Sequence, residues 1–92
     1  MFSFRNRKTF SVGEIRNLLE KDGKVVLRKE NPAKGIVEFW HWRYDGKYVR
    51  GEYSYTKGSS GYIVHLYKRQ LPLSSAVQEI KSKVSSGWEL IW

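Results

Sequence analysis

Hydrophobic and polar residues alternate most regularly in the middle of the chain, over residues 39–55. Two runs of aromatic and β-branched residues lie there on either side of Asp45-Gly46. An Asp-Gly pair between such runs favours a two-residue turn of type I′, because both residues tolerate the positive φ angles that this turn requires. The pattern therefore predicts a β-hairpin of strands 36–44 and 47–56, with Tyr44 and Lys47 beside the turn.

This turn also predicts which residues lie opposite each other, for example Arg43 opposite Tyr48 and Trp42 opposite Val49. Because side chains alternate between the two faces of a strand, the hairpin separates them into two sets. One face is mainly apolar, and we interpret it as the core face: Ile36, Trp40, Trp42, Tyr44, Val49, Tyr53 and Tyr55, interrupted by Glu38 and Lys47. The other, called the open face below, mixes aromatic and basic residues: Phe39, His41, Arg43, Tyr48 and Arg50, with Val37, Glu52 and Ser54.

The rest of the chain shows further helix and strand signals. Ser11 and Glu14 form a capping-box pattern before a helix expected over 12–21, and Asp22-Gly23 ends it. Strands are expected over 25–29 and 62–69, with glycine-containing loops at 30–35 and 58–61. Ser75 and Gln78 resemble a second capping box, and the helix after it is expected to end before Gly87. Residues 1–10 are expected to form an edge strand or a basic arm, and residues 88–92 a terminal strand or an apolar tail.

This order of elements predicts one α+β domain that spans residues 1–92. Short loops demand antiparallel pairing, so we expect a single four- to five-stranded antiparallel meander sheet with an N-terminal and a C-terminal helix packed on one face. A chain of 92 residues is normally a single domain. Two helices cover one face of a sheet only, so the open face is expected to meet water or a partner.

The length of the loop at 58–61 determines which residues of the fourth strand lie on each face of the sheet. If it is a four-residue loop, Lys57 lies opposite Tyr62, and Ile63, His65, Tyr67 and Arg69 join the open face. A five-residue loop would invert this assignment. We favour the shorter loop, because it places Val64 and Leu66 in the core.

Charge indicates the kind of partner. Seventeen Lys and Arg against nine Asp and Glu give a net charge of +8, which is typical of a protein that binds a polyanion such as nucleic acid. On the open face, arginines would hold phosphates while rings stack on unpaired bases, which favours single-stranded DNA or RNA. The predicted nucleic-acid-binding residues are Arg43, Arg50 and Arg69 for phosphates, Phe39, Tyr48 and Tyr67 for bases, His41 and His65 beside them, and Arg5, Arg7 and Lys8 in the arm.

Other interpretations remain open. The arginines could serve only to solubilise an exposed sheet. The basic face could instead capture an acidic protein, as an interaction module or effector does. A third hypothesis is a metal-independent ribonuclease with His41 and His65 as acid and base, although we expect a binding protein rather than an enzyme. Homodimerisation through a sheet edge or through the tail at 88–92 is a further hypothesis.

Several classes of function lack support in the sequence. The chain has no cysteine, which excludes disulfides and thiolate chemistry and favours a cytoplasmic, intracellular setting. Two histidines without clustered acids give no metal-binding spacing, so no metal and no cofactor are expected. No apolar run approaches the roughly 18 residues of a membrane span, and the first ten residues lack the apolar segment of a signal peptide.

Overall fold

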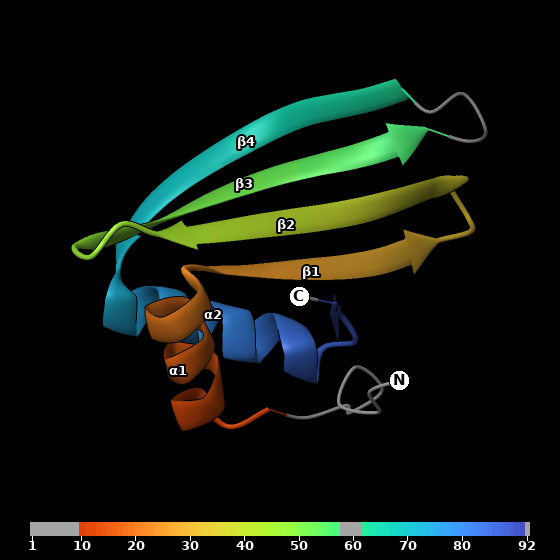
Figure 1. The fold of residues 1–92 in the computed structure, drawn as a ribbon. Helices are drawn as coiled ribbons and strands as arrows, with labels where there is room; N and C mark the ends of the chain where they lie inside the picture. The colour runs from red at the N-terminus through yellow and green to blue at the C-terminus, as the bar shows by residue number, and fades with distance from the viewer. Residues whose placement is uncertain (1–9, 58–61, 92) are drawn as a thin grey trace.

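The fold is α+β, as predicted. The computed structural model describes residues 10–57 and 62–91, with side chains described outside 62–67. Helix α1 spans Val12–Asp22 and helix α2 spans Leu73–Ser85. The strands are β1 (Lys24–Asn31), β2 (Ile36–Tyr44), β3 (Tyr48–Lys57), β4 (Tyr62–Pro72) and β5 (Glu89–Leu90). They form one antiparallel sheet in the order β4-β3-β2-β1-β5, with both helices together beside the β1 side of the sheet (Figure 1).

Helix α1 has the ends that its sequence predicts. The backbone N–H of Glu14 donates to Ser11 Oγ at 3.1 Å, and the backbone N–H of Ser11 donates to Glu14 Oε1 at 2.8 Å. This reciprocal pair is a capping box, which satisfies two backbone donors that the helix leaves unpaired. Gly23 ends the helix with φ at +76°, a conformation that glycine adopts without steric cost.

Helix α2 begins earlier than predicted, so the capping box at Ser75 and Gln78 is wrong. Strand β4 continues to Pro72, and the helix starts at the next residue without a side-chain cap. At the other end, Trp88 N–H donates to the Lys83 carbonyl at 3.0 Å and Gly87 N–H donates to the Val84 carbonyl at 3.2 Å. These two bonds form a Schellman motif, in which Gly87 has φ at +113°. The chain then turns into β5, so the terminal strand expected over 88–92 is confirmed over Glu89–Leu90.

The core lies between the helices and one face of the sheet. Trp40 and Trp42 stack with ring centroids 5.1 Å apart, and both are buried, as predicted for the core face. Trp42 lies directly opposite Gly51, and a Cβ atom at Gly51 would come within 2.5 Å of Trp42 Cζ3. The strand therefore carries glycine where the indole ring needs its space. The buried core cluster contains Phe10, Ile15, Leu19, Val25, Leu27, Trp40, Trp42, Val49, Ala76, Val77, Ile80, Val84 and Leu90.

The central hairpin differs from its predicted register. Tyr44 lies opposite Val49 and Arg43 opposite Arg50, so the two-residue turn flanked by Tyr44 and Lys47 is wrong. The carboxylate of Asp45 explains the longer turn: its Oδ1 accepts hydrogen bonds from the backbone N–H groups of Lys47 and Tyr48, each at 2.8 Å. These bonds also lower the pKa of Asp45, the bond from Tyr48 most. Every β2 residue pairs two positions further along β3 than predicted, and because this shift is even, both faces keep their members.

Strand β4 begins in the predicted register and then departs from it. Lys57 lies opposite Tyr62, as the four-residue loop predicts, and Ser54 lies opposite His65. The register then shifts between Tyr53 and Ser54, so that Tyr53 lies opposite Tyr67. This irregularity leaves one additional residue in β4, which is a β-bulge and reverses the alternation of everything after it.

Candidate functional site

The antiparallel register arranges the open-face residues in rows that run across the sheet. One row consists of Lys24, Arg43, Arg50 and Gln70, from β1, β2, β3 and β4 in turn. Residues directly opposite each other on neighbouring strands have Cβ atoms about 4.5–5.5 Å apart, and like charges at this spacing repel. The row therefore concentrates three cations across three strands with no carboxylate among them. It is called the cation row below.

The next row places a histidine and a carboxylate side by side. His41 of β2 lies directly opposite Glu52 of β3. These two residues and the arginine pair of the cation row, Arg43 and Arg50, line a hollow of about 200 Å³. His41, Arg43 and Arg50 are exposed and Glu52 is half-buried, so the hollow opens to solvent.

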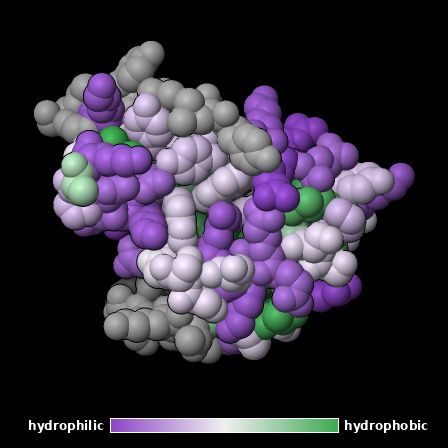
Figure 2. All heavy atoms as spheres, turned by 180° about the vertical axis from the view of Figure 1, so that it is seen from behind, coloured by the Kyte–Doolittle hydropathy of each residue, from purple (hydrophilic) through white to green (hydrophobic). Residues whose placement is uncertain are grey.

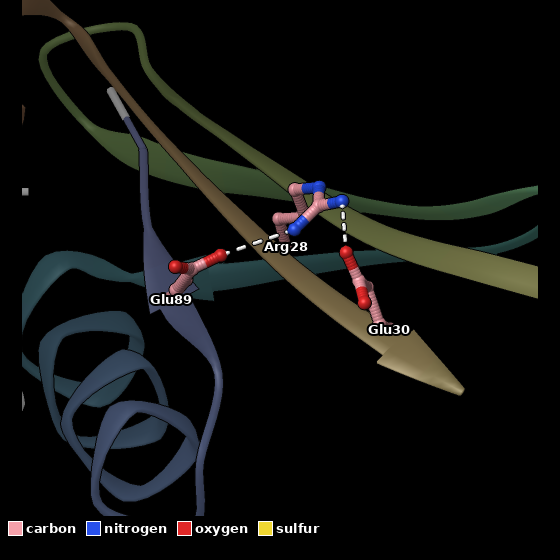
Figure 3. A network of polar contacts seen from close by, with 3 residues as sticks. All are labelled: Arg28, Glu30 and Glu89. Atoms are coloured by element: carbon pink, nitrogen blue, oxygen red, sulfur yellow. Dashed lines mark hydrogen bonds and ion pairs between the residues drawn. The ribbon is translucent and has the colours of Figure 1, made fainter. Parts of the chain in front are cut away.

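The guanidinium groups of Arg43 and Arg50 are available to bind an external anion. Within residues 10–57 and 62–91, neither the Arg43 nor the Arg50 guanidinium forms an ion pair or a side-chain hydrogen bond. Arg28, elsewhere on the same face, behaves differently: Figure 3 shows it between two carboxylates, with Nη2 at 2.6 Å from Glu30 Oε2 and Nη1 at 3.2 Å from Glu89 Oε1. The hydrogen bond to Glu30 is the main cause of the raised pKa of Arg28. Arg28 is thus neutralised within the protein, whereas the arginines of the hollow can serve an external anion.

Aromatic side chains adjoin the cations. Phe39 is half-buried, with its ring centroid 6.3 Å from that of His41 and the planes at 47°. Tyr48 is 37% exposed, and Lys47 Nζ lies 5.5 Å from the centre of its ring. Two of the three residues predicted to stack on bases are therefore on the open face. The structure brings together five of the predicted site residues there: Phe39, His41, Arg43, Tyr48 and Arg50.

The bulge in β4 removes Arg69 from this group. The Cα of Tyr67 lies opposite Tyr53 and that of Arg69 opposite Gly51, both on the core-face side of the alternation. Arg69 Nη1 donates to Glu79 Oε2 of helix α2 at 2.9 Å, which confirms that it turns toward the helices. The assignment of Arg69 to the open face is therefore wrong, because one inserted residue exchanges the two faces of a strand. The side chain of Tyr67 lies outside the described ones.

The side chains of the other predicted site residues lie outside the described ones. His65 pairs with Ser54 through the backbone, but its side chain lies outside the described ones. Arg5, Arg7 and Lys8 lie outside the described residues, so their roles stay predictions.

Lys24 and Glu52 are two residues of this face for which the sequence predicted no role. The predicted first strand began one residue too late for Lys24, and the wrong hairpin register placed Phe39 rather than His41 opposite Glu52.

Other kinds of site find little support in the part of the chain that is described. No group of three or more His, Cys, Asp or Glu residues there could hold a metal ion. Neither described helix has the length and apolarity to cross a membrane. Seen from behind, the molecule shows mainly hydrophilic residues, and the hydrophobic ones form small separate groups (Figure 2). Among the described residues, that side therefore shows no broad apolar patch.

Comparison of the chain with protein-family models, curated proteins and solved structures found no match.

Proposed function

We propose that this protein binds single-stranded nucleic acid through the open face of its sheet. The observation that carries the proposal is the cation row, in which Lys24, Arg43 and Arg50 lie side by side on three neighbouring strands. Placing the like charges of Arg43 and Arg50 directly opposite each other costs folding energy, and a bound anion would remove that cost. A chain of phosphates suits such a row, because each phosphate neutralised also releases counterions to the solvent.

The neighbouring rings favour single strands over a duplex. Phe39 and Tyr48 are accessible on the same face as the cations, and unpaired bases stack on such rings for about 1–3 kcal/mol each. A duplex keeps its bases stacked inside, so it would gain only the phosphate contacts. An intracellular location, where nucleic acids are available, belongs to the same proposal.

Fluorescence titration with short single-stranded and duplex oligonucleotides at several salt concentrations tests the proposal. The double variant Arg43→Ala/Arg50→Ala is expected to bind single strands at least tenfold more weakly. Its plot of log affinity against log salt should be shallower by about 1.4, from about 0.7 for each lost phosphate contact. A matched control, Arg16→Ala/Lys21→Ala, removes the same charge from helix α1.

The control variant should bind as the unmodified protein does. Salt-independent binding would contradict the proposal, and so would an equal loss of affinity in both double variants. Tighter binding of the duplex than of the single strand would refute the preference for unpaired bases.

A further inference from the structure

We infer that the hollow formed by His41, Glu52, Arg43 and Arg50 cleaves RNA without a metal ion. This inference rests on the proposed function, since RNA must first bind to the open face. It differs from the hypothesis of a His41–His65 pair, because the carboxylate of Glu52 takes the place of His65.

The register supplies the geometry for this chemistry. His41 and Glu52 are directly opposite on β2 and β3, and the Arg43–Arg50 pair is the next pair on the same face. Directly opposed Cβ atoms lie about 4.5–5.5 Å apart and diagonal neighbours about 7–8 Å, so all four side chains can reach one bound group. The hollow that they line has a volume of about 200 Å³. That is several times the roughly 30 Å³ share of one water molecule in the liquid, which leaves room for a phosphate.

The four residues supply the parts that phosphodiester transesterification needs. The carboxylate of Glu52 accepts the proton of a ribose 2′-hydroxyl, and the 2′-oxygen attacks the adjacent phosphorus. The bond from phosphorus to the 5′-oxygen breaks, and the imidazolium of His41 donates its proton to that leaving oxygen. The products are a 2′,3′-cyclic phosphate and a 5′-hydroxyl end. Glu52 ends protonated and His41 neutral, and proton exchange with water restores both without any further reactant.

The arginine pair stabilises the charge of this reaction. As the 2′-oxygen attacks, negative charge accumulates on the non-bridging phosphate oxygens, next to Arg43 and Arg50. Guanidinium groups are suited to this role because they donate several hydrogen bonds in a fixed planar geometry and stay ionised. Within the described residues, neither guanidinium forms an ion pair or a hydrogen bond with a carboxylate, so their N–H groups are available to the phosphate.

Incubation of the protein with a fluorescently labelled oligoribonucleotide in excess EDTA tests the inference. We expect fragments that end in a 2′,3′-cyclic phosphate, detected by mass spectrometry. Glu52→Gln and His41→Asn should each slow cleavage at least 100-fold, as general acids and bases contribute 10²–10⁴-fold. Cleavage by each variant is measured with the oligonucleotide saturated by protein, so that a change in affinity does not count as a loss of cleavage. The control Glu20→Gln removes an exposed carboxylate of helix α1 and should leave cleavage unchanged.

A second substrate separates binding from cleavage. An oligonucleotide with 2′-deoxy sugars should bind but stay intact, because it lacks the attacking hydroxyl. If the unmodified protein binds RNA and never cleaves it, the ribonuclease inference is wrong while the proposed binding function stands. Cleavage that persists in Glu52→Gln and His41→Asn would also overturn it. If the protein binds neither RNA nor DNA, the proposed function fails, and this inference fails with it.

Discussion

The contact between Gly51 and Trp42 gives the sharpest test of how this sheet is packed. Gly51 lies in the middle of β3, directly opposite Trp42, and the indole ring occupies the space where a side chain would stand. In Gly51→Ala, the new Cβ would lie 2.5 Å from Cζ3, 2.7 Å from Cε3 and 3.0 Å from Cη2 of the ring. Because Trp42 is fully buried, the ring can move only by displacing other core residues.

The size of the effect follows from two opposing contributions. Overpacking a close-packed core costs about 1–3 kcal/mol. Replacing glycine by alanine also restricts the unfolded chain, which returns about 0.4–1 kcal/mol. We therefore expect the free energy of unfolding to fall by about 1–2 kcal/mol. In a domain of this size, each kcal/mol lowers Tm by roughly 4–8 °C.

Thermal and urea unfolding followed by near-UV circular dichroism would measure this loss, and Gly13→Ala is the matched control. Gly13 lies in the first turn of α1, where the nearest atom to an added Cβ is Ser11 Oγ at 3.9 Å. The same substitution there should leave Tm unchanged or raise it, because alanine favours helix. In a Trp42→Phe background, which lacks the outer indole ring, Gly51→Ala should cost much less. A Tm for Gly51→Ala equal to or above that of the unmodified protein would refute the packing argument.

Three other substitutions test separate features. Burial raises the pKa of Tyr53 to about 12, and the hydrogen bond to Glu38 is the second cause. The neutral phenol therefore stabilises the fold fully below pH 10, and this stabilisation is lost as pH rises through 12. Alkaline unfolding should therefore be less steep in Tyr53→Phe, and equal slopes would contradict the assignment. Arg50→Gln should raise the free energy of unfolding by roughly 0.2–1 kcal/mol at low salt, because it relieves the repulsion between Arg50 and Arg43. This gain should vanish near 1 M salt, where the Debye length is about 3 Å. Ser11→Ala should cost about 1 kcal/mol in urea unfolding through loss of the α1 cap, and an unchanged midpoint would refute that role.

Local signals in the sequence were sufficient for most of the fold. The Ser11 capping box and Gly23 mark the ends of α1, and both act through hydrogen bonds or backbone angles that involve only a few neighbouring residues. The composition of the hairpin faces was also predictable, because alternation depends only on whether a residue number is odd or even. Trp40 and Trp42 are buried for this reason, although the pairing of β2 with β3 was predicted two positions away.

The predicted strand pairing was wrong where a single residue changes the register of a whole strand. The Asp45 carboxylate accepts two backbone hydrogen bonds, and this lengthened the turn beyond the two residues that Asp-Gly favours. The β4 bulge has no clear mark in the surrounding sequence, since Tyr67 and Arg69 suit either face of a strand. The sequence therefore predicted correctly which β2 and β3 residues share the open face, and it assigned Arg69 of β4 to the wrong face. The pairing of His41 with Glu52 became visible only with the observed register.

The two-residue strand β5 has a consequence for how the protein folds without aggregating. Strands β1 to β4 pair with their sequence neighbours, whereas the hydrogen bond between Arg28 and Glu89 joins residues 61 positions apart. Loop closure over such a distance is slow, so the outer edge of β1 is expected to stay uncovered until the rest of the sheet has formed. That edge carries Val25, Val26 and Leu27, an apolar segment that could pair with another chain. Strand β5 covers this edge by pairing Leu90 with Leu27, and we expect this pairing to be the last step of folding.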